Sequence, residues 1–371
     1  MAPMHGTGPN SSMTKTRPAK NNRRLISWLW IFFLKVSGLL AWAQREICSS
    51  SGIVVLTLHR VLPDPAFQEA NSPEGMVLRR TTFEALLSFL TRNCEITGLR
   101  GGFPEPDGNS VRPRIAITFD DGWKDTATVV YPLAVNYGTP FTVFVCSGIA
   151  GQSSPFWPEL VTRLWQKSAE MESQAESFSR ICQSAFPHYR FVPGNAGHLN
   201  DLIMCLKTVP AAKRDELVQA LCAPFEEDSS EVSELESTMT WQETKAMDRS
   251  LCSIGSHTQS HEILTRLPMD RARQELEESK KQIQEQLGHE CTMFSYTDGA
   301  WSNEVRDLVE LVGYKQAFIN SPGVWTRETN AWLIPRVNIW EGSITNRAGE
   351  FSATMFQYSV LWRAYRANNR K

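Results

Sequence analysis

Short apolar runs rich in β-branched residues recur along the chain, and helix-like segments lie between them. The first run is 53–58, the second is 114–119 with alternating apolar residues, and the third is 140–147 after a turn at Gly138. Between the first two, residues 81–90 have their apolar side chains at helical spacing. This order of strand, helix, strand predicts parallel β/α units.

The middle of the chain has a different pattern. Residues 157–165 and 202–221 look helical, and 226–236 is acidic, so 156–238 reads as a mostly helical insertion. A strand pattern resumes at 252–257. It is followed by a long charged helix that stops at Gly288, a strand through Phe294, and a last strand-like run at 332–339.

Composition limits the possible classes of function. A chain of 371 residues with 42% hydrophobic residues can bury the core of one large α/β domain or of two smaller domains. A net charge of -2 gives no basic field, so we expect no nucleic-acid partner. Eight scattered cysteines without a C-x-x-C pair predict buried thiols rather than a disulfide framework or a zinc finger.

The N-terminal region is basic and then apolar. Residues 1–24 hold five Lys and Arg and no acid, which predicts a disordered basic tail, and residues 25–50 predict a hydrophobic helix. Its apolar part, 25–43, has about the length that crosses a bilayer, but Lys35 interrupts it. A secretory signal, a membrane anchor and a tryptophan-rich helix packed on the domain all stay open. The anchor implies contact with a membrane through 25–43 and a membrane-associated or cell-envelope location.

Asp120 and Asp121 follow the second predicted strand, and Gly122 comes directly after them. Ligands collect at the carboxyl ends of parallel strands in β/α folds. Neighbouring strand residues point in opposite directions, so the two carboxylates share a site only if the chain turns there, as Gly122 permits. The alternative is a surface Asp-Asp-Gly turn.

His257 and His261 lie four residues apart, just beyond the apolar run at 251–254. That spacing lets both imidazoles face one point, on a helical turn or in a curled loop. Together with one aspartate they form a set of ligands that leaves coordination positions open, as a catalytic metal requires. The alternative is a pair of surface or capping histidines.

These motifs together resemble the polysaccharide deacetylase family, also called the NodB-homology or carbohydrate esterase 4 family. The resemblance runs from about residue 51 to 340 and includes VVLTLHRVLPD, ITFDDGWKD, TPFTVFVCSG, IGSHTQSHEILTRL, FSYTDG and LIPRVNI. It is similar to the exopolysaccharide-associated branch in particular. The resemblance implies a distorted (β/α) barrel of the NodB-homology type over 51–345, with the helical insertion at about 156–238, and it leaves 346–371 as a basic C-terminal tail.

The resemblance also implies a role for each motif residue. Asp121, His257 and His261 hold one divalent metal ion, usually Zn²⁺, and Asp120 is the general base. The physical reason is that a metal-bound carboxylate stays ionised with its lone pairs engaged, whereas its free neighbour can accept a proton from water. His59, in LTLHRV, matches the general-acid histidine that some members carry on the first strand. The alternative for His59 is a histidine that satisfies loop backbone groups.

The third motif departs from the family pattern. Where this branch usually has F-x-Y-P-x-G, residues 294–299 read FSYTDG, so the proline is lost and Thr297 stands in its place. Proline fixes a backbone that presents an oxyanion donor, and its loss predicts a looser oxyanion side. Tyr296 is the candidate contact to substrate or oxyanion. Arg336 is expected to orient Asp120 or to contact substrate, with an ordinary strand-end arginine as the alternative.

The activity implied is removal of N-acetyl groups from an amino-sugar oligosaccharide or polysaccharide of an exopolysaccharide or cell envelope. Four aromatic residues near the motifs are candidates for stacking on sugar rings, with a core position as the alternative: Trp123, Trp157, Tyr296 and Trp301. Two rival functions stay open. One is an amidase or esterase with another acyl substrate; the other is a catalytically silent carbohydrate-binding or assembly protein.

Overall fold

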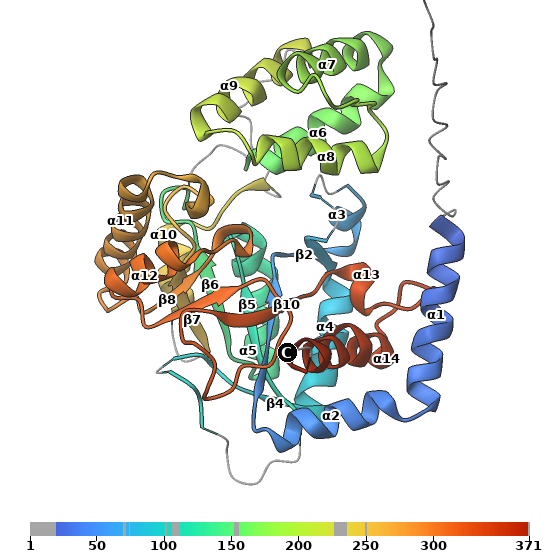
Figure 1. Cartoon of the computed structure of the whole chain (residues 1–371), viewed down its shortest axis with the longest axis vertical. Helices are drawn as coiled ribbons and strands as arrows, with labels where there is room; N and C mark the ends of the chain where they lie inside the picture. The colour runs from blue at the N-terminus through green and yellow to red at the C-terminus, as the bar shows by residue number, and fades with distance from the viewer. Residues whose placement is uncertain are drawn as a thin grey trace, which may run out of the picture.

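Seven parallel strands form a closed barrel at the centre of the molecule (Figure 1). The structure, a computed structural model, describes residues 20–69, 72–73, 75–100, 102–105, 112–151, 156–225, 236–248 and 251–369. The barrel strands are β1 (Ile53–Leu58), β5 (Arg114–Phe119), β6 (Phe141–Val145), β7 (Cys252–Ser256), β8 (Met293–Ser295), β9 (Gln316–Ile319) and β10 (Ile334–Asn338). Since β1 pairs with both β5 and β10, the sheet closes. The predicted distorted β/α barrel is confirmed.

Three short strands lie outside the ring: β2 (Arg60–Leu62), β3 (Val77–Arg79) and β4 (Glu95–Ile96). β2 pairs with β3 in a separate small sheet, and β4 pairs with β5. The sequence patterns did not indicate these strands, and they also missed β9, whose four residues lie in no long apolar run.

Alternation along the strands separates side chains that fill the barrel from side chains that face the outer helices. Ile53 and Val55 of β1 belong to a cluster with Phe144 and Phe318, whereas Val54 and Leu56 pack in the cluster that includes the outer helices. Successive strand residues face opposite sides, so the first set fills the barrel and the second faces the helices. Nearer the carboxyl ends, the inward positions become polar: Thr57, Thr118, Asp120, Ser295 and Arg336. The functional groups therefore stand on an apolar floor.

Helices cover the outside of the barrel. They are α4 (Arg80–Asn93), α5 (Tyr131–Tyr137) preceded by the π-helical η1 (Thr126–Val130), α10 (Trp241–Met247), α11 (Met269–Leu287) and α12 (Asn303–Leu311). α10 begins with a capping box between Thr240 and Glu243, and α11 ends at Gly288 with φ 78°. Short helices occupy the loops: α3 (Asp64–Glu69), η4 (Leu264–Arg266), η5 (Thr297–Gly299) and α13 (Glu341–Ile344).

The insertion is a helical unit with a core of its own. It contains α6 (Trp157–Glu170), α7 (Glu172–Ala185), α8 (Ala196–Leu206), α9 (Ala211–Cys222) and η2 (Ala223–Phe225). Trp165, Phe178 and Leu221 are among the buried residues of its own cluster. Figure 1 shows these helices above the carboxyl ends of the barrel strands. Residues 226–235 of the acidic stretch lie outside the described residues.

The N-terminal helix is broken in two, contrary to the single helix expected over 25–50. α1 (Lys20–Val36) and α2 (Leu39–Ser49) meet at Gly38, whose φ of 77° ends the first helix. Residues 20–24 are helical rather than disordered, while residues 1–19 of the expected tail lie outside the described part. None of the helices in the described ranges has the length and apolar character needed to cross a bilayer.

The C-terminal region is ordered where a basic tail was expected over 346–371. α14 (Ala353–Phe356), the π-helical η6 (Gln357–Trp362) and α15 (Arg363–Asn368) follow one another. Trp362 packs with Leu34, Leu40 and Ala43 of the N-terminal helices. The tail prediction is therefore wrong for 353–368, because this segment also has an apolar face, which packs on α2.

Candidate metal centre

The loops after β5 and β7 have an unusual backbone. Asp121 has φ 74°, and Thr258 and His261 have φ 68° and 60°. Such left-handed conformations cost a non-glycine residue about 1–3 kcal/mol and cluster at functional sites. Gly122 continues the turn at φ 81°, where an added Cβ would lie 3.2 Å from Cγ1 of Val145. The sharp turn lets Asp120 and Asp121 both reach the site, as the sequence had predicted.

Asp121, His257 and His261 form one cluster. Oδ1 of Asp121 lies 3.5 Å from Nε2 of His257 and 3.3 Å from Nε2 of His261, and the three candidate ligand atoms all lie within 4.8 Å of one another. This oxygen is buried and accepts no hydrogen bond within the described ranges. A buried carboxylate oxygen without a partner, facing two imidazole nitrogens, fits a divalent cation.

Hydrogen bonding prepares His257 to act as a ligand. Its Nδ1 lies 2.8 Å from the carbonyl oxygen of Ser295. A carbonyl only accepts, so Nδ1 carries the proton and Nε2 keeps its lone pair for a cation. Burial lowers the pKa of His257, which favours the same neutral form. The His261 ring packs edge-on against Phe156, with centroids 4.6 Å apart.

The second oxygen of Asp121 is held by an indole. Nε1 of Trp123 donates to Oδ2 at 3.0 Å, and the Arg60 guanidinium lies 4.3 Å from the centroid of the Trp123 ring on its other side. Burial acts to raise the pKa of Asp121, but the three histidines around it, His261 foremost, together outweigh burial and hold that pKa well below its usual range. Because Trp123 is fully buried, its proposed stacking on a sugar ring is wrong.

Asp120 is clamped by Arg336. Nη1 and Nη2 of the guanidinium donate to Oδ1 and Oδ2 of Asp120, each at 2.7 Å, and Nη2 also donates to the Ser295 hydroxyl. Burial acts to raise the pKa of Asp120, but the charge and hydrogen bonds of Arg336 together with the nearby histidines outweigh burial and lower that pKa. Asp120 therefore stays ionised, with Oδ2 4.0 Å from Nε2 of His257. Arg336 lies where the sequence placed an orienting residue.

A cavity of about 690 Å³ opens over these residues. His59, at the end of β1, lines it beside Asp120, and Nδ1 of His59 is buried without a hydrogen-bond partner in the described segments. Thr297, at the position of the lost proline, also lines the cavity, and its hydroxyl is likewise unpartnered there. The structure thus brings His59 to the same site as both predicted motifs.

Tyr296 does not belong to the cavity wall. Its ring is buried against Phe294, and its hydroxyl donates to the carbonyl oxygen of Trp332 at 3.0 Å. The prediction of Tyr296 as a substrate or oxyanion contact is wrong for its side chain, since inward and outward positions alternate and Tyr296 faces the helices. Trp157 lines the cavity, whereas Trp301 does not contribute to its lining.

Sequence reasoning missed the wall that the insertion contributes. Asn200, Met204 and Lys207 line the cavity opposite the barrel loops. Nζ of Lys207 lies 2.6 Å from Oδ1 of Asp298, and Nη2 of Arg214 lies 2.8 Å from Oε1 of Glu262. These two ion pairs join the insertion to the loops after β8 and β7. No sequence signal marks them, because the partners are far apart in the chain.

Comparisons with known proteins agree with this arrangement. The family model for polysaccharide deacetylases matches residues 107–193 and 227–317, which contain the motifs of Asp120 and His257. YxkH of Bacillus subtilis (strain 168), which is grouped with the polysaccharide deacetylases, is 26% identical over 117 residues. That match covers 32% of this chain and 42% of the relative.

Solved structures with a similar outline include a de-N-acetylase from Aggregatibacter actinomycetemcomitans, with TM-score 0.49 and 14% identity over 83% of this chain and 100% of that chain. The polysaccharide deacetylase BC0361 from Bacillus cereus has TM-score 0.49 and 17% identity, over 83% of this chain and 67% of that chain. The family model matches both motif-bearing segments, and the closed barrel brings those motifs together. This chain belongs to the polysaccharide deacetylase family.

Proposed function

We propose that this chain is a metal-dependent hydrolase that removes N-acetyl groups from an amino-sugar oligosaccharide or polysaccharide. One observation carries the proposal: the Asp121, His257 and His261 cluster stands beside an ionised Asp120 at the floor of a single cavity. His59 lines the same cavity. A group that can accept a proton, Asp120, and a group that can donate a proton, His59, therefore both face this cavity.

The three clustered residues would hold the cation, and we propose Zn²⁺. Two neutral imidazoles and one carboxylate suit zinc and leave coordination positions open. When bound, the ion polarises the amide carbonyl and makes a water molecule more acidic. Asp121 suits this role because Trp123 occupies one of its carboxylate oxygens and leaves the other free toward both histidines.

Asp120 takes the proton of the attacking water in this proposal. Arg336 fixes both of its oxygens, and the hydroxyls of Thr57 and Ser295 also donate to Oδ2 at 3.4 Å. Oδ1 accepts only from Arg336 within the described residues, so its second lone pair can accept from water. His59 then gives a proton to the departing amine nitrogen, because an unprotonated amine is a poor leaving group. Nδ1 of His59 has no hydrogen-bond partner within the described residues, so no protein group there competes with the amine for it.

The test is acetate release from chitooligosaccharides and from poly-N-acetylglucosamine by zinc-loaded protein. We expect Asp120→Asn, which keeps the size and removes the base, to lower kcat by about 10²–10⁴ while zinc still binds. Asp270→Asn, which changes an exposed carboxylate at the start of α11, serves as the control and is expected to keep its activity.

The outcomes separate the rival functions. Equal acetate release by wild type and Asp120→Asn would exclude Asp120 as the base. Stoichiometric zinc without release from any amino sugar would favour a silent carbohydrate-binding protein. Release of another acyl group, with no acetate from amino sugars, would favour the amidase or esterase alternative.

A further inference from the structure

α1 is apolar on two faces, but the protein covers only one of them. Ile31 and Leu34 are buried, at 3% and 0% exposure. On the other side Leu29, Phe32, Phe33 and Val36 are 62%, 65%, 54% and 67% exposed. Their positions i, i+3, i+4 and i+7 form one continuous stripe along the helix. A helix that is apolar all round is normally covered on all sides, so this stripe lacks a partner.

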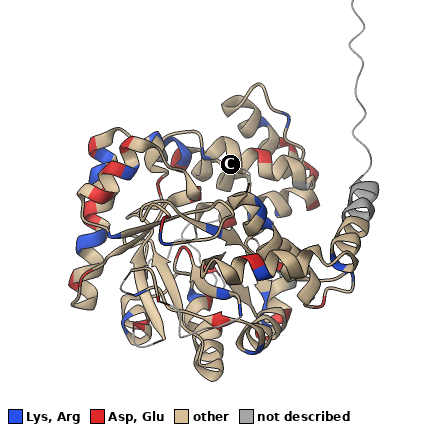
Figure 2. Ribbon diagram, turned by 60° about the horizontal axis from the view of Figure 1, so that its bottom comes forward, with Lys and Arg blue, Asp and Glu red and all other residues tan. Residues whose placement is uncertain are grey.

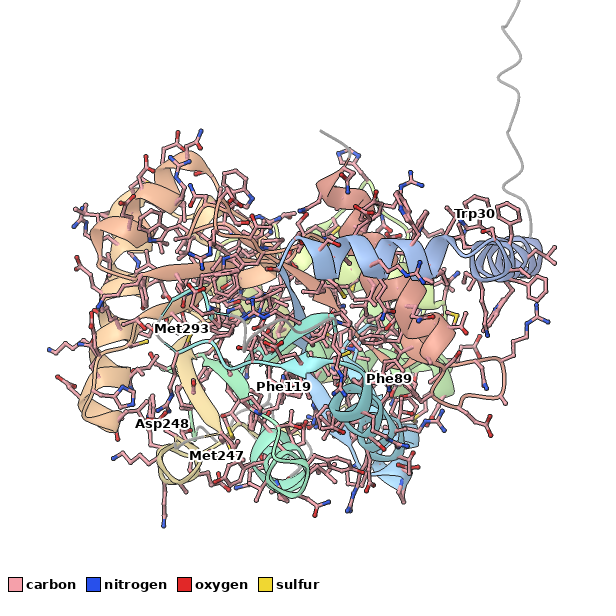
Figure 3. The ribbon with its side chains drawn as sticks, turned by 90° about the horizontal axis from the view of Figure 1, so that it is seen from below. Trp30, Phe89, Phe119, Met247, Asp248 and Met293 are labelled. Carbon is pink, nitrogen blue, oxygen red and sulfur yellow. The ribbon has the colours of Figure 1, made fainter. Side chains whose placement is uncertain are left out.

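Packing of the buried face of α1 against the protein makes its exposed face point outward. Leu34 packs with Leu40, Ala43 and Trp362, which anchors α1 to α2 and to the C-terminal helices. The exposed residues therefore cannot fold back onto the protein without breaking this cluster. Figure 3 shows Trp30 of α1, which is 46% exposed, pointing away from the barrel. Figure 2 shows the described part of α1 largely free of charged residues.

The charge of the N-terminal sequence identifies the kind of partner. The first 45 residues contain seven Lys and Arg residues and no Asp or Glu. A second copy of the chain on this stripe would bring two such basic segments together, which disfavours a dimer. An apolar stripe with basic flanks and aromatic residues instead fits the interface of an anionic membrane. Lys35 is exposed near the stripe and can extend its ammonium group to the lipid headgroups.

The length of the stripe sets the mode of contact. Eight residues of helix extend about 12 Å, which is far less than the roughly 30 Å of a bilayer core. We propose that the exposed stripe of α1, formed by Leu29, Phe32, Phe33 and Val36 and flanked by Trp30, lies in the headgroup region of an anionic membrane. The helix lies along the surface, and the barrel stays outside the bilayer.

Flotation of the full-length chain with lipid vesicles tests this inference. We expect binding to vesicles of equal parts phosphatidylcholine and phosphatidylglycerol, and much weaker binding to phosphatidylcholine alone. Phe32→Ser combined with Phe33→Ser should lower partitioning by at least about tenfold, since each change removes a large apolar side chain from the interface. Val135→Ser combined with Leu311→Ser, at sites 49% and 66% exposed on other helices, is the matched control and should bind like wild type.

A second readout locates the contact on α1. Brominated lipids should quench the part of the tryptophan fluorescence that Trp30→Phe removes. Failure of wild type to float with anionic vesicles, or equal flotation of the Phe32, Phe33 variant, would overturn the inference. So would a lipid-free dimer that this variant turns into monomers, since the stripe would then bind a second copy. Acetate release from soluble oligosaccharides should persist in the variant, which separates this inference from the hydrolase proposal.

Discussion

The two carboxylate oxygens of Asp121 have different surroundings. Trp123 donates to Oδ2, and Oδ1 faces His257 and His261. The indole is itself fixed, because Arg60 lies over its ring and pairs with Asp125 at 3.1 Å. A run of buried groups therefore aims one oxygen at the cation position. The sequence shows that Trp123 follows the motif, but only the left-handed turn at Asp121 brings the indole back to the carboxylate.

Replacing Trp123 by Phe should weaken zinc binding. The ring would still fill its site, but Oδ2 would lose its donor and the carboxylate could rotate. Loss of such a supporting hydrogen bond typically costs about 10- to 100-fold in metal affinity. Competition with a chelator measures the dissociation constant, and Trp301→Phe, at a 42% exposed tryptophan, is the control. An unchanged zinc affinity in Trp123→Phe would show that the indole only fills space.

Glu159 gives a prediction about pH. It is fully buried at the start of α6, and neither carboxyl oxygen accepts a hydrogen bond within the described residues. Burial raises its pKa from an ordinary value of 4.5 to about 8, against the opposing charge of Arg60. Between these values the unfolded chain loses the proton while the folded protein keeps it. The stability of the folded state therefore falls as pH rises through this window.

Glu159→Gln should remove this dependence, because the amide stays neutral at every pH. Near pH 8 the metal-free variant should be more stable than wild type by on the order of a few kcal/mol. Near pH 4.5 the two should differ little. Urea unfolding at both pH values gives the comparison. An equal difference at both pH values would mean that packing, and not ionisation, separates the two proteins.

At the scale of the elements, two ion pairs connect the helical insertion to the barrel loops and help to hold it over the cavity. Its core is separate from that of the barrel, and the ion pairs Lys207–Asp298 and Arg214–Glu262 connect it to the loops of the site. The helical patterns at 157–165 and 202–221 predicted α6 and parts of α8 and α9, whereas no pattern indicated α7 by itself. The placement of these helices over the cavity was not predictable, because ion pairs between distant segments leave no pattern in one sequence.

Lys207→Ala should change substrate binding more than stability. The pair with Asp298 is partly exposed, with side chains 21% and 36% accessible, so the free energy of unfolding should fall by less than about 1 kcal/mol. The cavity wall would loosen, and KM should rise by up to about tenfold with kcat nearly unchanged. Steady-state kinetics and urea unfolding check both values. Lys213→Ala breaks an exposed pair within α9 and should leave KM unchanged.

The barrel strands that are buried along their whole length were the easiest to predict from the sequence. β1, β5 and β6 are buried at every residue, as expected for parallel strands covered on both sides. β1 and β6 were found from short apolar runs, and β5 was found from its alternating apolar residues. β9 was missed, because its four residues begin with Gln316 and the run is too short to stand out. The C-terminal helices were missed for a different reason. Their basic residues suggested a tail, although Val360 and Trp362 are buried.

At the scale of the whole molecule, barrel closure assembles the site from both ends of the domain. β1 carries His59 at its end and lies between β5, which leads to Asp120, and β10, which contains Arg336. The positions of the two motifs after two strands predicted that one aspartate would meet His257 and His261, and the family resemblance named Asp121 as that aspartate. That β1 closes the ring was not readable from periodicity, which identifies strands but not their neighbours.

Closure of the barrel by β1 and β10 also has a consequence for folding during synthesis. Asp120 is synthesised more than two hundred residues before Arg336. Among the lysines and arginines of the described residues, only Arg336 forms an ion pair with Asp120. Until β10 emerges, folding of the earlier strands would bury a carboxylate without its counter-charge, which is strongly unfavourable. Closure of the barrel is therefore expected only after β10 has been synthesised. Completion of the barrel and pairing of Asp120 with Arg336 would then be a single late step in synthesis.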